Sequence, residues 1–280
     1  MRFWKTALAC LFACTLCGVA QAQVITQWNF NSPVPDNNTA TGTDVPSIGT
    51  GTISTLNLAQ SFTFASGSAS GGSSDPAGTN DNSGFQTTGY PAPQSGNETA
   101  GITVLTSTVG FSNITVSWDQ RHSNSASRFV AFYYTTDGAN FTRLALSALN
   151  SNPGTTPSGG APASTAGGYG ANGTFSAFDE TVTGAGDDWF NGRSVNLTGI
   201  AGVDNNPNFG FQIVASFDAG TNYLGSGSTA YATTGTWRFD MITVSAAVPE
   251  PSAYALCLVT LAGVGVVRYR KKFWNRKEVA

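Results

Sequence analysis

The stretch from Phe209 to Phe217 has the sequence FGFQIVASF, in which apolar residues occupy every second position from the first to the last. Glycine, glutamine, valine and serine stand between them. A period of two is typical of a β-strand that turns one face toward a hydrophobic core. This stretch therefore predicts a long strand packed against a core.

Similar patterns recur along the chain. Leu56–Phe64 and Ile114–Asp119 alternate in the same way, and Arg128–Thr136 is apolar on both faces, which predicts a central strand. Asp137 and Gly138 predict a tight hairpin that leads into Phe141. Further strands are expected at Val24–Asn31, Ile102–Val109, Phe141–Leu149, Phe175–Val182, Ser194–Leu197 and Trp237–Val244.

About ten strands in one region, with no long stretch of helical periodicity, predict an all-β fold. Two segments rich in Gly, Ser, Asn, Thr and Pro, Ala65–Gly101 and Asn150–Gly173, are expected to be long loops. No repeat of fixed period is present, which argues against solenoids and propellers. We expect a single jelly-roll-like β-sandwich.

The C-terminal end has a different character. The motif Val248, Pro249, Glu250 and Pro251 is followed by sixteen uncharged, mostly apolar residues at 252–267, then by six cations within 268–280. The two prolines keep the motif extended. As a helix, the apolar run would be about 24 Å long, which is short for a hydrocarbon core of about 30 Å. The cations are expected to stay on the cytoplasmic side.

This tail resembles a PEP-CTERM sorting signal, with the motif at 248–251, a transmembrane helix at 252–267 and a basic tail at 268–280. Tails of this kind are also named after the C-terminal domain of ice-binding proteins. The resemblance implies that an exosortase of a Gram-negative, polysaccharide-producing bacterium processes the chain. It covers only the last thirty or so residues and implies nothing about the ligand of the rest.

The N-terminal end is typical of a secretory signal peptide. Arg2 and Lys5 precede an apolar stretch, and Ala20 and Ala22 form a small-residue cleavage site. We expect signal peptidase to cut between Ala22 and Gln23, so that residues 1–22 are removed and residues 23–247 form the exported domain. Lipoprotein processing at Cys14 is a weaker alternative, because Phe12 suits that motif poorly.

Cysteine and charge are distributed by segment. All four cysteines lie in the two hydrophobic ends, which excludes a disulfide framework or a cysteine site in the exported domain. That domain holds five arginines, no lysine and fourteen acidic residues, a net charge of −9. A surface of this sign repels phosphate, so no nucleic acid is expected as a partner.

The stretch around the only histidine is the first candidate site. Trp118, Asp119, Arg121 and His122 offer a polar edge for a polysaccharide, in which the indole stacks on a sugar ring and the charged groups bind hydroxyls. The alternative, which we favour, is a hydrogen-bonded turn with Trp118 in the core. A catalytic triad of His122, Asp119 and Ser123 is disfavoured, since triad members must converge from separate elements.

The first and last strands supply the second candidate site. Trp28–Asn31 and Trp237–Val244 resemble the opening and closing strands of carbohydrate-binding jelly rolls, whose end strands often pair and can hold a structural Ca²⁺ nearby. Asn31 and Asp240 are the positions implied here, and their oxygens suit that ion. The alternative is that Asp240 pairs with an arginine or caps a turn. No other cofactor is expected.

Together these features predict a non-enzymatic cell-surface or extracellular-matrix protein associated with exopolysaccharide and biofilm. It would be anchored transiently in the inner membrane and then released to the cell envelope, outer surface or medium. Three alternatives stay open: a carbohydrate-binding jelly-roll module, an ice-binding protein, and a polysaccharide hydrolase. The carboxylates considered for a hydrolase are Asp179, Glu180, Asp187 and Asp188.

Overall fold

A computed structural model describes residues 22–144, 166–167, 177–179, 187–217 and 222–247 of the 280-residue chain. The chain divides into two compact units, and one of them, Val24–Ala246, holds nearly all of these residues. The signal peptide expected at 1–22, apart from Ala22, and the sorting signal expected at 248–280 lie outside the described residues. Within the described ranges, the chain has no helix with the length and hydrophobicity that crossing a bilayer requires.

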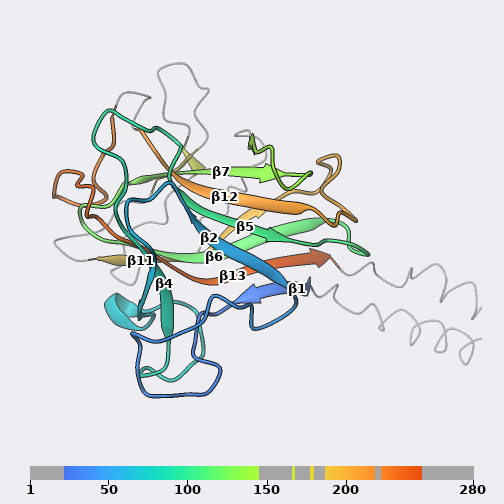
Figure 1. The fold of residues 1–280 in the computed structure, drawn as a ribbon, viewed down its shortest axis with the longest axis horizontal. Helices are drawn as coiled ribbons and strands as arrows, with labels where there is room; N and C mark the ends of the chain where they lie inside the picture. Colours follow the sequence, from blue (N-terminus) through green and yellow to red (C-terminus); the bar gives the residue numbers. More distant parts are fainter. Residues whose placement is uncertain (1–21, 145–165, 168–176, 180–186, 218–221, 248–280) are drawn as a thin grey trace, which may run out of the picture. The chain divides into compact units, whose positions relative to one another are not determined.

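The domain consists of two antiparallel sheets, which confirms the expected β-sandwich (Figure 1). The six-stranded sheet contains, in spatial order, β11 (Asp188–Asn196), β6 (Ile114–His122), β13 (Trp237–Ala247), β4 (Ser83–Thr87) and β3 (Thr63–Ser66), with β1 (Ala22–Trp28) paired to β13. The seven-stranded sheet contains β2 (Gly51–Leu56), β5 (Gly101–Thr106), β12 (Phe209–Ser216), β7 (Phe129–Thr135), β10 (Ala177–Asp179) and β9 (Ala166–Gly167), with β8 (Thr142–Arg143) paired to β7.

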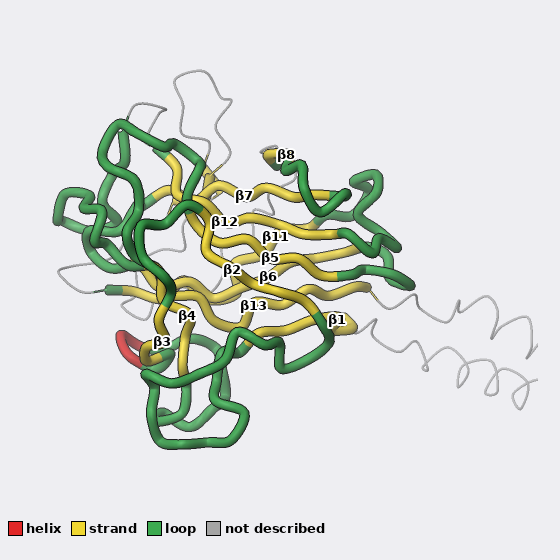
Figure 2. The backbone as a smooth tube through the Cα atoms, viewed as in Figure 1, coloured by secondary structure: helices red, strands yellow, loops and turns green. Residues whose placement is uncertain are grey.

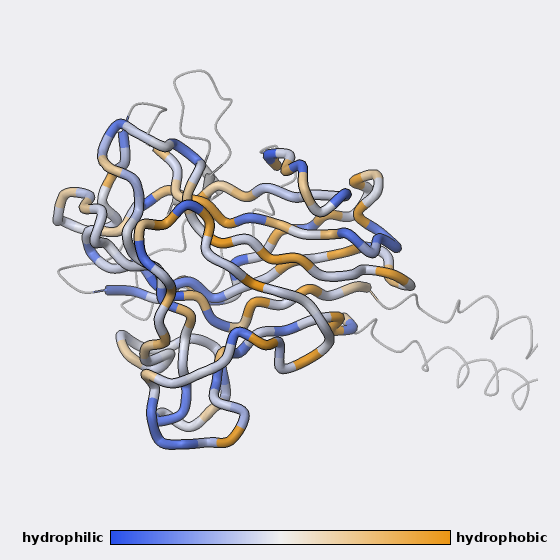
Figure 3. Tube along the Cα trace, viewed as in Figure 1, coloured by the Kyte–Doolittle hydropathy of each residue, from blue (hydrophilic) through white to orange (hydrophobic). Residues whose placement is uncertain are grey.

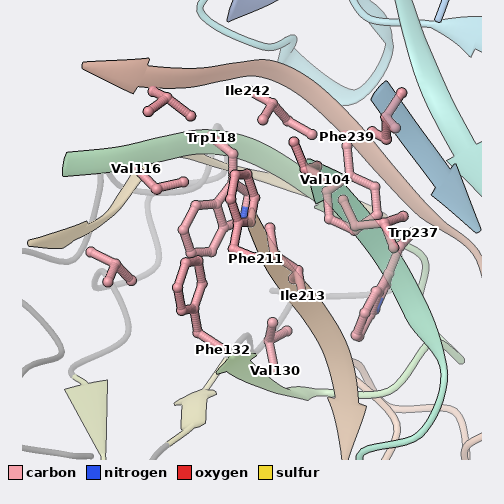
Figure 4. Close-up of a cluster of buried hydrophobic side chains, with 14 of the residues drawn as sticks. Val104, Val116, Trp118, Val130, Phe132, Phe211, Ile213, Trp237, Phe239 and Ile242 are labelled. Carbon is pink, nitrogen blue, oxygen red and sulfur yellow. The ribbon is translucent and has the colours of Figure 1, made fainter. Parts of the chain in front are cut away.

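The hydrophobic core lies between the two sheets. Phe132 of β7 stacks on Phe211 of β12 within one sheet, and on Trp118 of β6 from the other, with ring centroids 5.5 and 5.8 Å apart (Figure 4). All three side chains are at most 1% exposed. The apolar stretches follow the strands, while the connecting segments are largely polar (Figure 3). Period-two alternation thus brings one face of each sheet into a common core.

The strongest strand predictions are confirmed. Within the predicted strand at 209–217, β12 covers Phe209–Ser216, and within the apolar stretch at 128–136, β7 covers Phe129–Thr135 and has strand neighbours on both sides as expected of a central strand. Asp137 accepts hydrogen bonds from the backbone amides of Ala139 and Asn140, and Gly138 has a φ of 78°, as a tight turn into β8 requires. The end strands β1 and β13 pair, also as expected.

The expectation of one strand over Leu56–Phe64 is wrong. The strand β2 ends at Leu56 because Asn57 takes a left-handed φ of 48°, and β3 begins only at Thr63. Phe62 nevertheless packs on the core, stacked on Phe85 with ring centroids 4.2 Å apart. The alternating pattern at 56–64 therefore comes from two segments, the end of β2 and the start of β3, which are joined by a turn and pack on the same core.

The expectation that 65–101 is one long loop is also wrong in part. Strand β4 lies inside it, as does the short 3-10 helix η1 (Ala69–Gly71), drawn in red in Figure 2. The sequence SGFQT of β4 has a single large apolar residue, Phe85, which is why its alternation is not evident. The strand predicted at 141–149 is described only as far as Leu144, because residues 145–165 lie outside the described part of the chain.

Glu98 connects the segment before β5 to three strands of the seven-stranded sheet. Arg143 of β8 forms a two-pronged ion pair with it, at 2.7 and 2.8 Å, and Tyr133 of β7 and Ser216 of β12 also donate to its carboxylate. Burial opposes ionisation of Glu98, but these donors outweigh burial and hold its pKa below the ordinary value. The ion pair between Glu98 and Arg143 therefore holds the segment before β5 against the seven-stranded sheet.

Candidate functional site: a buried carboxylate cluster

The outer face of the six-stranded sheet carries charge that is hidden from solvent. Strands β6 and β13 pair so that Asp119 lies opposite Asp240, and Arg121 opposite Arg238. Because side chains alternate along a strand, these four project from the same face, away from the core. All four are at most 8% exposed. A further layer of chain must therefore cover them.

That layer is the segment from Ser66 to Ser83, which we call the cap. Ser73 donates from its hydroxyl to Asp240 Oδ2 at 2.6 Å, and the backbone amide of Ser74 donates to Asp119 Oδ2 at 2.6 Å. Arg238 donates to the carbonyl of Ser66 and, at 2.5 Å, to Gln86. The cap therefore supplies hydrogen-bond partners to Asp119, Asp240 and Arg238, which the strands alone would leave buried without them.

Two β-bulges flank the opposed aspartates. One lies on β13 between Asp240 and Thr243, where Met241 has a φ of 47°, and its amide donates to Asp240 Oδ1 at 2.8 Å. The other lies on β11, where Gly192 has a φ of 66° and donates to Asp119 Oδ1 at 2.7 Å. Bulges re-aim side chains and occur often beside functional sites.

The surroundings of the two opposed aspartates disfavour their ionised forms. Burial raises the pKa of Asp240 well above its ordinary value, and the carboxylates of Asp75 and Asp119 raise it further. Burial likewise raises the pKa of Asp119. Neither forms an ion pair with any residue in the described part of the chain. The nearest arginine on the strand, Arg238, has its pKa lowered to about 10 by burial and by Arg121.

Two asparagines complete the cluster. Asn31 donates to Asp75 Oδ2 at 2.7 Å and accepts from the amide of Ser83 at 2.8 Å. Asn82, only 3% exposed, donates to Ser73 Oγ at 3.3 Å, but its Oδ1 has no hydrogen-bond partner. The predicted pair of Asn31 and Asp240 thus belongs to one cluster, linked through the cap residues Ser73 and Asp75.

The cluster is a mixed set of oxygen groups. Among the described residues, no three His, Cys, Asp or Glu side chains converge in a ready-made metal site. Any ion at this place would therefore need amide or hydroxyl oxygens together with carboxylates, a combination that Ca²⁺ accepts and Zn²⁺ does not favour. The unpartnered amide oxygen of Asn82 is compatible with such a ligand set.

The first candidate stretch is divided between the two faces of β6. This strand continues through His122, so the turn starts only at Ser123. Trp118 is 1% exposed, stacks in the core and donates to Gln120 at 3.0 Å, so its indole has no face available for a sugar. Asp119 and Arg121 face the cap instead, and Arg121 forms an ion pair with Asp187.

His122 forms its hydrogen bonds with a carbonyl and a hydroxyl group, and not with a carboxylate. Its ring is fully buried, with Nδ1 3.0 Å from both the carbonyl of Ser127 and the hydroxyl of Ser226. Burial, helped by the charges of Arg193 and Arg121, lowers its pKa to about 3. Because His122 and Asp119 project from opposite faces of β6, they do not form a catalytic pair.

The candidate hydrolase carboxylates are spread over different elements. Asp179 ends β10 in the seven-stranded sheet, whereas Asp188 begins β11 in the six-stranded sheet, with Asp187 just before it. Glu180 lies outside the described residues. Asp187 forms an ion pair with Arg121 and accepts a hydrogen bond from the backbone amide of Asn124 at 3.1 Å. These contacts give Asp187 a structural role at the edge of the cap.

A second polar surface crosses the seven-stranded sheet. Strand register places five partly or fully exposed residues in one row, which we call the polar row: Ser54, Thr103, Gln212, Tyr133 and Arg143. Beside it, a hollow of about 380 Å³ is lined both by polar residues, which include Thr50, Thr52, Ser107 and Asn208, and by the apolar residues Leu105, Pro207 and Phe209. Sequence patterns missed this row because it depends on the register of distant strands.

Comparison with known proteins adds little. The chain matches no known family and no curated protein. Among solved structures, it is similar to the K1 cleaved adhesin domain of Lys-gingipain from Porphyromonas gingivalis W83, with 11% sequence identity and a TM-score of 0.35. The match covers 82% of this chain and all of that one. A similarity of this size carries no functional argument.

Proposed function

We propose that this chain is an exported, non-enzymatic protein of the cell surface or extracellular matrix, sorted by an exosortase through its C-terminal motif. The observation that carries the proposal is the order of segments at 248–280: a rigid motif, a short apolar run and a basic end. A predicted signal peptide at the other end supports it. The acidic, cysteine-free domain between them suits an extracellular role.

We further propose that the sandwich is of the jelly-roll type. The pairing of the first strand with the last is consistent with this topology. The exported domain would then be released to the envelope or the polysaccharide matrix, with the membrane helix serving only as an intermediate anchor. Signal peptidase and the exosortase are the partners during export.

Replacing Pro249 or Glu250 with alanine is expected to leave most of the protein unprocessed in the membrane fraction. The substitution removes the extended, charged peptide that a processing enzyme would grip. Fractionation and immunoblotting of the producing cells would measure the ratio of full-length to trimmed protein. An Ala247→Ser variant, just before the motif, is the matched control. Normal trimming of the Pro249 and Glu250 variants would refute the sorting proposal.

A carbohydrate-binding role is the second candidate, and the polar row favours it. Neutral glycans are bound through hydroxyl and amide hydrogen bonds, which Ser54, Thr103 and Gln212 offer across adjacent strands. Gln212 already donates to Thr103 at 3.2 Å, which holds both side chains in place. The adjoining hollow is lined in part by Thr52, Leu105 and Phe209 of the same three strands and extends this surface.

The double variant Ser54→Ala and Gln212→Ala is expected to weaken polysaccharide binding about tenfold or more, at about 1 kcal/mol for each lost hydrogen bond. Affinity electrophoresis in a panel of neutral polysaccharides would measure it. Thr115→Ala, on the other sheet, should leave mobility unchanged. If the wild-type protein is retarded by none of the polysaccharides, the binding role is refuted while the sorting proposal stands.

A further inference from the structure

Strand β2 forms one edge of the seven-stranded sheet (Figure 1). Its neighbour is β5, with which Gly51–Leu56 pairs in a continuous antiparallel register without a bulge. In such a pair, every second residue turns its N–H and C=O groups away from the neighbouring strand. In the part of the chain that the structure describes, no other residue forms a hydrogen bond with the backbone of Thr52–Leu56. This edge is therefore open to a further strand.

Two edge strands of the six-stranded sheet are protected against such pairing. Strand β11 is interrupted by a bulge between Phe190 and Arg193. Strand β3 has only four residues, and Arg238 donates to the carbonyl of its last residue, Ser66. Bulges, short strands and charged side chains are the usual means by which proteins prevent pairing between sheet edges. Protection of these edges makes the open edge at β2 a distinct feature of the domain.

The sequence around β2 has neither charge nor proline. No charged residue occurs between Asp44 and Asp75, and no proline between Pro46 and Pro76. A basic partner would therefore find no carboxylate along this edge to bind. Two copies of the domain, each with a net charge of −9, can approach here without like charges facing each other. The charge distribution favours a second copy of this chain as the partner.

A second copy of β2 also fits the edge by symmetry. Gly51 lies against the indole of Trp28, where a side-chain carbon would stand 2.8 Å from the ring, so the accessible part is centred on Ser54. A two-fold axis through Ser54, perpendicular to the sheet, makes the two strands antiparallel. It sets Ser54 opposite its own copy and Thr52 opposite the partly exposed Leu56. Every hydrogen bond and every contact then forms twice.

We propose that β2 pairs with β2 of a second copy, so that the seven-stranded sheets of two protomers form one continuous sheet. A contact through single strands is smaller than a standard interface of about 1,600 Å², so the dimer forms reversibly and at high local concentration. The polar row ends at Ser54. Pairing at this residue would join the rows of two protomers into one line of hydroxyl and amide groups.

Light scattering of the full-length chain in a mild detergent, from micromolar to millimolar concentration, tests the proposal. The protein mass of wild type is expected to rise toward twice that of the monomer. Ser54→Lys and Ser54→Glu should each remain monomeric, because two like charges would face each other across the axis. An equimolar mixture of the two variants should dimerise, which also shows that both are folded. Thr115→Lys, on the other sheet, should dimerise as wild type does.

Disulfide formation locates the contact. In a background with the four native cysteines replaced by serine, Ser54→Cys is expected to cross-link to a second copy, because the Cβ atoms of directly opposed residues lie about 5 Å apart. Thr52→Cys is the register control. The axis at Ser54 places Thr52 roughly 13 Å from its own copy, four residues along the partner strand, which is too far for a disulfide.

Three results would overturn the proposal. The first is a wild-type protein that stays monomeric at every concentration. The second is a dimer that Ser54→Lys leaves intact, because the contact then lies in another part of the chain. The third is cross-linking of Ser54→Cys to a different protein in the producing cells, which would assign the edge to that partner in place of a second copy.

Discussion

Replacing Phe132 with alanine is expected to lower the free energy of unfolding by about 3–5 kcal/mol. The ring is 1% exposed and stacks on Phe211 of its own sheet and on Trp118 of the facing sheet (Figure 4). Its removal leaves a cavity at the centre of the sandwich, and the rigid sheets on either side close it only partly.

Urea unfolding followed by tryptophan fluorescence measures this loss, since Trp118 reports directly on the contact. Phe132→Leu, which keeps most of the volume, should cost less than about half as much. Val34→Ala is the surface control, because Val34 is 75% exposed, and it should change stability by no more than about 0.5 kcal/mol. A loss below about 1 kcal/mol for Phe132→Ala would contradict the packing of the two sheets.

Acid is expected to destabilise the domain through His122. In the folded protein the pKa of this ring is about 3, chiefly because of burial, so the ring stays neutral above that pH. In the unfolded chain the ring takes up a proton near pH 6.5. The unfolded state therefore binds more protons between these values. Stability falls by about 1.4 kcal/mol for each pH unit below 6.5, which amounts to roughly 2 kcal/mol at pH 5.

The comparison of wild type with His122→Asn isolates this effect. The amide retains a donor toward the carbonyl of Ser127 but does not titrate. Asp119 and Asp240 have raised pKa values and act in the opposite direction, but they do so equally in both proteins. Urea unfolding at pH 7 and pH 5 should show that the variant loses about 2 kcal/mol less than wild type. Equal losses would mean that His122 is not held neutral.

Much of the sandwich follows from local patterning. Strands such as β12, β6 and β7 carry strong alternation or continuous hydrophobicity, and the sequence predicts each of them. The two exceptions have physical causes. Strand β4 buries one large apolar residue, Phe85, among small polar neighbours, so it has little hydrophobic signal. The break at Asn57 depends on a single left-handed residue within a pattern that otherwise continues.

The cluster under the cap was only partly predictable. Asp119 and Asp240 each stand out locally, but their meeting depends on the register of two strands more than a hundred residues apart in sequence. The bulge at Met241 also resets the alternation, so that Ile242 enters the core although Asp240 faces outward. One signal for Asp75 does exist: it is an acidic residue in a segment otherwise rich in Gly, Ser and Asn.

The position of β13 has a mechanical consequence. It is flanked by β6 on one edge and by β4 and β1 on the other (Figure 1), and its last residue, Ala247, comes directly before the proposed sorting signal in the sequence. Hydrogen bonds between antiparallel strands run perpendicular to the strand axis. A pull along β13 therefore loads many of these bonds in shear at once, on both edges. A tethered domain of this design would resist the drag of flowing water better than one that is pulled from an edge strand, where the bonds open one after another.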